Sequence, residues 1–328
     1  MSTFLLADIG ATNARFMLLE ESVDQILVGP DFGGGDSIGQ NIVLPTAEFT
    51  QAGDLFAQVL SQLDTPRIDQ VVIAAAGPLQ ADGGIVITNT GLVLHPDQGP
   101  AAFSAPLHLV NDFFAVSTSV PHLVSLDQIG GDANATGHKA VLGPGTGLGM
   151  AGLLSTPSGE WVVVPSEGGH ISLAPGSPLE AELWGVLSQS LDHVSWENVL
   201  SGPGLVNLYQ AMCAIWGSKP EQKTAADITA AGLEMLDPVC HQTIETFAGI
   251  LGNAAGNLAL SYLAQGGVYL AGGITGKLDG FLQTSPLRRR FDERGPMTDM
   301  VKSIPLFVVR DEEPGLLGAY HIARSLRR

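Results

Sequence analysis

The glycine-rich stretch from residue 141 to residue 170 constrains the fold of this chain more than any other stretch. It reads VLGPGTGLGMAGLLSTPSGEWVVVPSEGGH, so apolar runs of strand length alternate with glycine turns. We predict three strands joined by turns, because glycine adopts backbone conformations that other residues avoid. The first turn, Gly143–Gly149, leaves backbone N–H groups uncovered, and such groups bind phosphate well. A tight turn without a ligand is the alternative.

The residues after this turn exclude two common nucleotide-binding motifs. Met150–Leu154 is apolar and strand-like, whereas the GxGxxG motif of a dinucleotide-binding unit opens a helix. No Lys-Ser or Lys-Thr pair follows the glycines, as a P-loop requires. The pattern that remains is a hairpin that binds phosphate through its backbone, and it favours a kinase.

Charge and cysteine usage limit the partners. The chain has 328 residues, a length that suits two lobes, with 15 Lys+Arg against 33 Asp+Glu and a net charge of −18. Such a surface repels nucleic acid and anionic membranes, so local backbone dipoles and a divalent cation must hold any bound polyanion. Cys213 and Cys240 are far apart and form no CxxC motif, which disfavours a disulfide framework and indicates a reducing cytoplasm. No apolar run approaches the roughly 20 residues of a membrane helix.

Apolar periodicity predicts an α/β chain made of two similar series, each opening with a glycine-bearing hairpin. Strands are expected at 4–9, 15–19, 71–76, 85–88, 107–110, 268–271 and 306–309. Helices are expected at 54–63, 113–119, 178–190, 205–216 and 238–264, with a last helix ending at Ile322. The glycine-rich segment Gly29–Gly39 is expected to be a surface loop. This order indicates a duplicated α/β unit with a cleft between the halves.

The first hairpin combines a carboxylate with a turn rich in hydrogen-bond donors. Asp8 ends the first strand, and Gly10-Ala11-Thr12-Asn13 follows it. Asp8 is a candidate Mg²⁺ ligand, acting through water, since Mg²⁺ keeps several waters beside one or two carboxylates. Thr12 and Asn13 are candidate contacts for phosphate oxygens. An ordinary hairpin whose Asp and Asn satisfy their own turn is the alternative.

A third glycine turn, Gly272-Gly273, follows the strand predicted at 268–271. The missing side chains would admit a flat ring such as adenine. A plain strand-to-helix turn is equally consistent with these residues.

Polar residues elsewhere suggest a polyol pocket. Asn111-Asp112 ends a buried strand, the place where open α/β sheets carry their sites. Asp112 is a candidate base for a hydroxyl proton during phosphoryl transfer, with a helix cap as the alternative. Glu167 and His170 stand in a Gly-Gly turn and suit sugar hydroxyls, with a pair of metal ligands as the rival. Glu197 would complete the ring of acceptors, or else be a solvated helix residue.

Seven segments in the same order closely resemble the bacterial ATP-dependent glucokinases over about residues 4–325. The segments are DIGATNAR at 8–15, NDF at 111–113, GPGTGLG at 143–149, EGGH at 167–170, SGPGLVNLY at 201–209, GGI at 272–274 and PGLLG at 314–318. Each motif alone is weakly specific, and their combined order is strongly specific. The resemblance implies ATP- and Mg²⁺-dependent phosphorylation of the 6-hydroxyl of D-glucose to glucose 6-phosphate.

The resemblance also implies a fold and an assembly. The expected fold is two-lobed and actin/hexokinase-like (ribonuclease H-like), with a mixed five-stranded sheet flanked by helices in each lobe and ATP–Mg²⁺ in the cleft. Residues 1–121 and 306–328 would form a small discontinuous lobe, and residues 122–305 the large lobe. A homodimer is expected, with sugar and ATP as small-molecule partners and neither nucleic acid nor membrane among them.

Residue roles carry over onto matching positions. Asp112 is the implied general base, and the implied glucose ligands are Asn111, Asp112, Glu167, His170 and Glu197. The implied ATP-binding residues are Ala7, Asp8, Ile9, Gly10, Ala11, Thr12, Asn13, Gly145, Thr146, Gly147, Gly272 and Gly273.

The chain departs from the family pattern at two positions. Ala11 stands where the family has glycine, and a positive φ there would strain the first hairpin. Leu92 stands where the family has an aromatic residue expected near the sugar. A kinase for another hexose (mannose, fructose or glucosamine) and a catalytically inactive sugar-sensing protein are therefore the alternatives. An actin-like assembly protein is disfavoured, because it needs no polyol pocket.

Overall fold

The computed structural model describes residues 2–21, 39–63, 67–88, 90–278 and 280–327. The chain divides into two compact units, residues 1–125 with 311–328 and residues 126–310. Apart from Gly39, the loop predicted at Gly29–Gly39 lies outside the described residues. Within the described residues, no helix is both long and apolar enough to cross a membrane.

The first unit is built on a mixed five-stranded sheet in the order β3-β2-β1-β4-β7. The strands are β1 Ser2–Ile9, β2 Asn13–Glu21, β3 Gly39–Pro45, β4 Gln70–Ala75 and β7 Leu107–Asn111. β1, β2 and β3 are antiparallel neighbours, and β1, β4 and β7 run parallel. The predicted first hairpin is confirmed, with Ile9 opposite Ala14 at its end. The sheet brings the ends of β1 and β7 to one edge, because parallel strands end on the same side.

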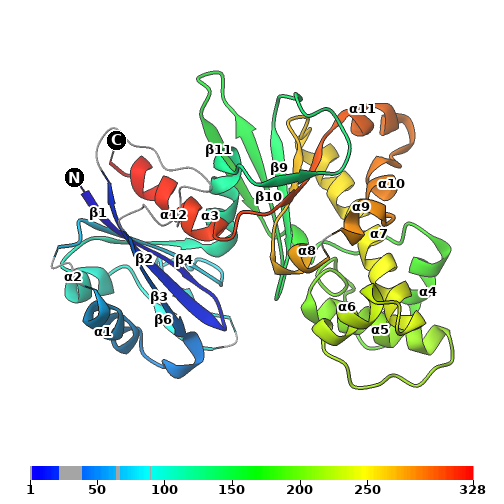
Figure 1. Ribbon diagram of the computed structural model, residues 1–328, viewed down its shortest axis with the longest axis horizontal. Coiled ribbons are helices and arrows are strands. Elements are labelled where there is room, and N and C mark those ends of the chain that lie inside the picture. The colour runs from blue at the N-terminus through cyan, green and yellow to red at the C-terminus, as the bar shows by residue number, and fades with distance from the viewer. Residues whose placement is uncertain (1, 22–38, 64–66, 89, 279, 328) are drawn as a thin grey trace. The chain divides into compact units, whose positions relative to one another are not determined.

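Side chains alternate between the two faces of this sheet. Leu5, Ala7 and Ile9 of β1 pack on one face against α1, Ala52–Gln62. The opposite face is covered by α3, Asp112–Ser119, and α12, Pro314–Ser325, which lie side by side (Figure 1). The remaining short elements of the unit are α2 Gln98–Phe103 and the β5 Ile85–Val86 and β6 Val93–Leu94 pair.

The C-terminal helix α12 packs closely onto the first unit. A side chain at Gly318 would collide with the carbonyl of Ala115 in α3. The His321 ring stacks on His122 with centroids 3.4 Å apart. Burial, and then the neighbouring His122, lower the pKa of His321 to about 3, so its ring is neutral at neutral pH.

Leu92 belongs to the core of the first unit. Its side chain is fully buried among the apolar residues that include Ile85, Ile87 and Leu94. In this chain the side chain at position 92 therefore packs into the core. A leucine there fills core volume, which an apolar side chain does at low cost.

The second unit contains a six-stranded mixed sheet in the order β11-β10-β9-β12-β13-β8. The strands are β8 Leu126–Gln128, β9 Lys139–Pro144, β10 Leu148–Ser155, β11 Trp161–Ser166, β12 Val268–Leu270 and β13 Leu306–Val309. The three strands predicted from the glycine-rich stretch are present as β9, β10 and β11. The expected five strands become six because β8 pairs with the edge of β13. β13 also pairs with β12. Residues 306–310 were expected in the first unit, and the structure assigns them to the second.

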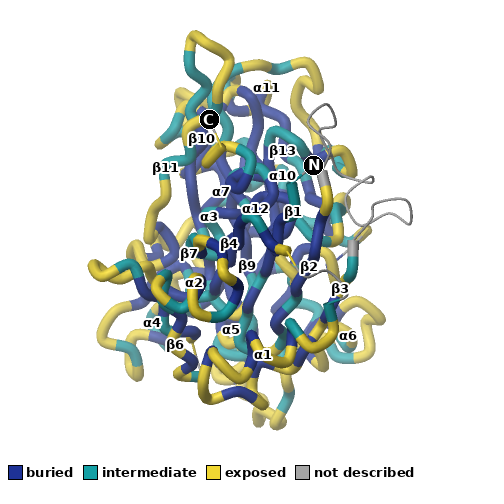
Figure 2. Tube along the Cα trace, turned by 90° about the vertical axis from the view of Figure 1, so that its left-hand side faces the viewer, coloured by how far each residue is buried: buried dark blue, intermediate teal, exposed yellow. Residues whose placement is uncertain are grey.

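Helices surround one long buried helix, α7 (Pro238–Tyr262), which Figure 2 shows as buried along much of its length. Asp237 caps its start by accepting from the N–H groups of Val239 and Cys240. The other helices are α4 Pro178–Leu187, α5 Gly202–Ile215, α6 Ala225–Leu233, α8 Gly273–Lys277, α9 Phe281–Thr284, α10 Leu287–Asp292 and α11 Thr298–Ser303. The core of the unit lies between α7 and the sheet.

Glycines on α7 allow α10 to approach its backbone. A side chain at Gly252 would collide with the carbonyl of Leu287, the first residue of α10. At Gly249, one turn earlier, the nearest atom to an added Cβ is the Cγ of Arg290 at 3.7 Å. Two glycines of one helix therefore differ in the space around them.

Gly252→Ala is expected to destabilise the protein by about 1–3 kcal/mol, because a buried backbone must shift. Gly249→Ala is the matched control and should be neutral or stabilise by up to about 1 kcal/mol, since alanine favours helix. Urea unfolding of both variants measures the difference. Equal effects of the two changes would contradict the close-packing argument.

Candidate active site

Two hydrogen bonds from Thr46 anchor the first glycine hairpin. Gly10 N–H donates to the Asn13 carbonyl at 3.0 Å across the turn. The Thr46 hydroxyl donates to the Gly10 carbonyl at 2.7 Å, and the Thr46 N–H donates to the Thr12 carbonyl at 3.0 Å. Among the described residues, nothing accepts from the N–H groups of Ala11 and Thr12. These two donors are available to an anion.

The turn accommodates Ala11 without the strain expected of it. The described non-glycine residues with positive φ are Ser104, Met235 and Leu263, and Ala11 is not among them. The concern that alanine distorts this hairpin is therefore unfounded. Ala7 and Ile9, predicted with this motif, are fully buried, so only their backbones lie near the turn.

Two carboxylates lie at the sheet edge of the first unit. Asp8 is the penultimate residue of β1, and Asp112 begins α3 directly after β7. Burial, and then repulsion from Asp112, raise the pKa of Asp8 to about 6, while Arg15 opposes the rise. Burial also raises the pKa of Asp112, opposed by the N–H of Phe113. The edge therefore concentrates negative charge that a cation would relieve.

Asn111 is the cap of α3. Its Oδ1 accepts from the N–H groups of Phe113 and Phe114 at 2.9 and 3.1 Å. Its Nδ2 donates to the Gly77 carbonyl at 3.0 Å. Asn111 thus performs the capping that was the alternative role for Asp112. The same side chain also hydrogen-bonds Asp112, which opposes the rise in the pKa of that carboxyl.

The second glycine hairpin joins β9 to β10 and is anchored in a similar way. Gly145 N–H donates to the Gly147 carbonyl at 2.8 Å, and the Gly145 carbonyl accepts from Gly202 N–H, at the start of α5, at 2.9 Å. The N–H groups of Thr146 and Gly147 have no acceptor in the described part of the chain. Leu148 N–H donates to Glu197 Oε2 at 2.8 Å. Both hairpins therefore present a pair of free amides.

The predicted sugar-binding residues of the second unit lie on two segments that pair with each other. Glu197 N–H donates to the Gly169 carbonyl at 2.9 Å, and Trp196 N–H donates to the Ile171 carbonyl at 3.0 Å. His170 lies 4.0 Å from both Glu167 and Glu197, measured between ring nitrogens and carboxylate oxygens. The structure therefore brings Glu167, His170 and Glu197 together.

A metal site at Glu167 and His170 was the rival interpretation of this turn. Within the described residues, no group of three or more His, Cys, Asp or Glu side chains could hold a metal ion. Glu167 and His170 are exposed, which suits contact with a ligand in solution. Glu197 is half-buried and is not the solvated helix residue that was the alternative.

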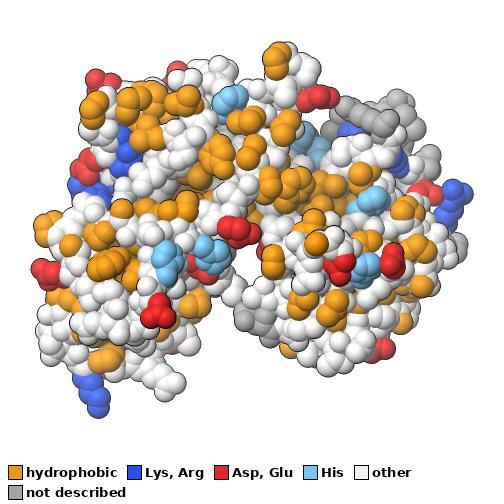
Figure 3. Space-filling model, turned by 180° about the vertical axis from the view of Figure 1, so that it is seen from behind, with side chains coloured by type: hydrophobic (Ala, Val, Ile, Leu, Met, Phe, Trp, Pro, Cys, Tyr) orange, Lys and Arg blue, Asp and Glu red, His pale blue; other side chains and the backbone are white. Residues whose placement is uncertain are grey.

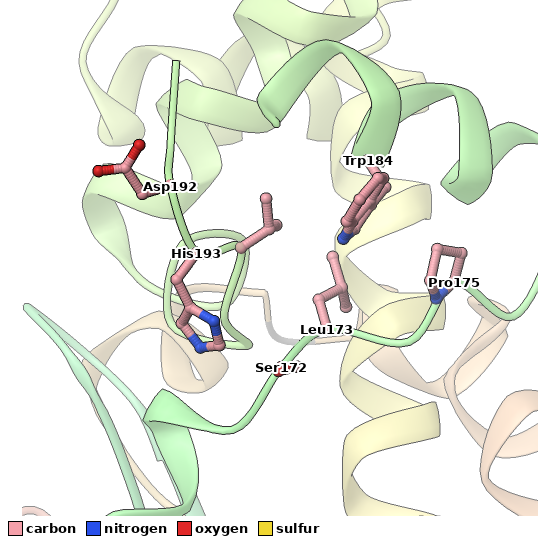
Figure 4. Close-up of a pocket in the computed structure, with 7 residues that line it drawn as sticks. Ser172, Leu173, Pro175, Trp184, Asp192 and His193 are labelled. Carbon is pink, nitrogen blue, oxygen red and sulfur yellow. The ribbon is translucent and has the colours of Figure 1, made fainter. Parts of the chain in front are cut away.

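A pocket of about 390 Å³ lies beside this loop (Figure 4). Figure 4 shows Trp184 and His193 on opposite sides of it. Its lining residues are Ser172, Leu173, Pro175, Trp184, Asp192, His193 and Val194. None of the predicted site residues lines this pocket, although His193 Nε2 lies 2.9 Å from the His170 carbonyl oxygen. The His193 ring therefore contacts the backbone of the segment that carries Glu167 and His170.

The third glycine turn joins β12 to α8 and needs glycine at its first position. Gly272 has φ +113°, and a Cβ there would lie 2.6 Å from the Pro144 carbonyl oxygen. Gly273 has open space around it. This turn therefore lies against the end of β9, next to the second hairpin.

Sequence reasoning missed Thr46 and His193. A single threonine after an apolar strand, or a histidine before a valine, carries no signal of its own. Their partners, Gly10 and His170, are 36 and 23 residues away in the chain, so only the folded structure pairs them.

Comparison with known proteins identifies the family. A family model described as Glucokinase matches residues 5–326. The chain belongs to the glucokinase family. The glucokinase of Saccharophagus degradans is 36% identical over 323 residues, which cover 97% of this chain and 97% of the relative.

Solved glucokinase structures agree. One from an Antarctic psychrotroph is 33% identical with a TM-score of 0.82, covering 99% of each chain. The glucokinase of Balamuthia mandrillaris, solved in complex with glucose, has a TM-score of 0.80 at 24% identity over 98% of this chain and 94% of that chain, and it supports the fold alone.

Membership of the glucokinase family confirms two expectations. The fold is that of the actin-like ATPases and hexokinase-like sugar kinases. The activity is that of an ATP-dependent sugar kinase that phosphorylates glucose. The face shown in Figure 3 carries basic side chains only at scattered places, which agrees with the net charge of −18.

Gly272→Ala should destabilise the chain by about 1–3 kcal/mol, because it combines a positive φ with a collision against backbone. Gly273→Ala is the neighbouring control and should change the free energy of unfolding little. Thermal or urea unfolding distinguishes them. If both variants matched the unchanged protein, the tight turn at Gly272 would be refuted.

Proposed function

We propose that this chain transfers the γ-phosphoryl group of ATP to the 6-hydroxyl of D-glucose, with Asp112 as the general base. The single observation that carries the proposal is the match to the glucokinase family over residues 5–326. The free amides of both hairpins support it, because phosphoryl transfer depends on positioning and on stabilising charge.

Asp112 suits the role of base for four reasons. It stands at the end of a parallel strand, where ligands of α/β sheets bind. Asn111 caps the helix, so the Asp112 carboxylate is not needed as a cap. One of its oxygens, Oδ1, accepts from Phe113 N–H at 2.8 Å, which fixes the carboxylate and leaves Oδ2 for the hydroxyl proton. Its raised pKa makes it a better proton acceptor than an exposed carboxylate.

The proposed glucose ligands differ in how much hydrogen-bonding capacity they have left. Glu167 and His170 are exposed and their side chains are available. Glu197 spends Oε2 on Leu148 N–H, so Oε1 is the oxygen free for a hydroxyl. Asn111 already bonds the Gly77 carbonyl and Asp112, so it would contact a sugar hydroxyl only by sharing these bonds. Neighbouring hydroxyls of a sugar match such a set of acceptors and donors.

For ATP, we propose that the free amides of Ala11, Thr12, Thr146 and Gly147 bind phosphate oxygens. The turn at Gly272 and Gly273 would hold the adenine ring.

We further propose that Asp8 binds Mg²⁺, through water. The residues fit this ion, because two half-buried carboxylates repel each other there and carboxylate oxygen is the ligand that Mg²⁺ prefers. Bound Mg²⁺ would neutralise charge on the transferred phosphoryl group. A homodimer and a cytoplasmic location are also proposed, the latter because both cysteines are free thiols.

Turnover measured in a coupled assay with ATP–Mg²⁺ against a panel of hexoses tests the proposed reaction. Preference for glucose is expected. Preference for mannose, fructose or glucosamine would keep the mechanism and move the specificity. Binding of sugar without turnover of any hexose would favour the sugar-sensing alternative.

Asp112→Asn should lower kcat by at least about 10²-fold, because the amide cannot accept the proton. Glucose affinity, measured by tryptophan fluorescence, should change little. Asp97→Asn is the control within the same unit, since Asp97 is exposed and caps nothing with its side chain. A variant that loses glucose binding together with turnover would show that Asp112 chiefly holds the sugar.

Asp8→Asn should stabilise the protein and weaken its use of ATP–Mg²⁺. The folded pKa of about 6 exceeds the unfolded value of 3.8. Ionisation of Asp8 therefore lowers the free energy of unfolding, and this loss builds between pH 3.8 and about 6 and is complete above that range. The gain from asparagine should be about 1–3 kcal/mol at pH 7.5 and should vanish toward pH 4, where the carboxyl is protonated in both states. Unfolding at both pH values measures it. A variant less stable than the unchanged protein at pH 7.5 would contradict the proposed charge repulsion.

A further inference from the structure

Thr46 occupies a fixed position under the first hairpin. It begins the short 3₁₀ helix Thr46–Glu48 directly after β3 and is completely buried. β3 pairs with β2 up to Pro45, which lies opposite Asn13. This strand pairing places Thr46 beside the hairpin, independently of the conformation of the turn. Its β-branched side chain is stiff at χ1, so the hydroxyl has little freedom to turn away.

We propose that Thr46 is a positioning residue for ATP: its hydroxyl fixes the Gly10 carbonyl inward, so that the Ala11 N–H on the same peptide unit faces the nucleotide phosphates. The proposal rests on the proposed function of this hairpin. It assigns no chemical step to Thr46, which acts through the backbone that it holds.

The hairpin needs such an anchor because its own bonds are few. One bond, from Gly10 N–H to the Asn13 carbonyl, crosses the turn. Rotation of a peptide unit in a glycine–alanine turn would exchange an N–H for a C=O at the phosphate. A carbonyl bonded to Thr46 resists this rotation, because turning it outward leaves a buried hydroxyl without a partner.

The second hairpin supports the same logic. There the Gly145 carbonyl is fixed by the N–H of Gly202, and the amides of Thr146 and Gly147 are left free. A helix N-terminus supplies the donor in that unit. In the first hairpin the donor to the glycine carbonyl is instead a side chain, the Thr46 hydroxyl at the start of the short 3₁₀ helix.

Thr46→Val tests the proposal, since it keeps the shape and removes the donor. KM for ATP should rise roughly five- to tenfold, the effect of one hydrogen bond. Glucose affinity without nucleotide should stay unchanged. Thr46→Ser retains a hydroxyl and should restore KM to within about twofold. Thr46→Ala serves if the valine variant folds poorly, and it should raise KM in the same way.

Thr243→Val is the matched control. Thr243 is also fully buried and donates to a carbonyl, that of Val239, at 2.7 Å, but it lies in α7. It should change stability without changing KM for ATP. The proposal is overturned if Thr46→Val lowers only the melting temperature, or if Thr46→Ser fails to restore KM.

Failure of the proposed reaction would be visible separately. If the unchanged protein turned over no hexose, titration calorimetry with Mg²⁺ and a non-hydrolysable ATP analogue would still compare the Thr46 variants. Weaker binding of that analogue by Thr46→Val supports the positioning role. Equal binding by both proteins refutes it.

Discussion

The two anchored glycine hairpins are the constraint on which the rest of the proposed site depends. A chain with a net charge of −18 repels polyanions at long range, so attraction must come from dipoles that act at short range. Backbone amides supply it only when their orientation is fixed. In each hairpin a glycine carbonyl is held from outside the turn, by Thr46 in one case and by Gly202 in the other. The surrounding strands position those anchors.

The carboxylates of the first unit lower the stability of the folded chain. Asp8 and Asp112 are each half-buried, and their mutual repulsion adds to the burial that raises the pKa of Asp8. A protein selected for stability alone would replace one of them by a neutral residue. Their retention is understandable if a cation and a hydroxyl proton are bound there. The strain is therefore an argument for function that is independent of the family match.

Much of the fold was predictable because its elements are continuous patterns. The apolar run of β4 and the long periodic helix α7 read directly from the sequence. The three residues of β8 carry no such pattern, and only pairing with β13 makes them a strand. The candidate site divides in the same way. Its glycines and carboxylates stand in short motifs, whereas the Thr46 anchor is a contact between distant segments. The burial of Leu92 was also unreadable, because a core and a pocket wall both take leucine.

Glu197 contacts both the second hairpin and a proposed sugar ligand, so its side chain cannot be given a single role. Its Oε2 accepts from Leu148 N–H at the base of the second hairpin, while Oε1 lies 4.0 Å from His170. A Cβ on Gly147 would lie 2.6 Å from the same Oε2, so the glycine exists partly to admit the carboxylate. One side chain thus supports the proposed phosphate amides and faces the proposed sugar ligands. A shift of this carboxylate toward a sugar hydroxyl would change its bond to Leu148 N–H, because the two oxygens belong to one rigid group.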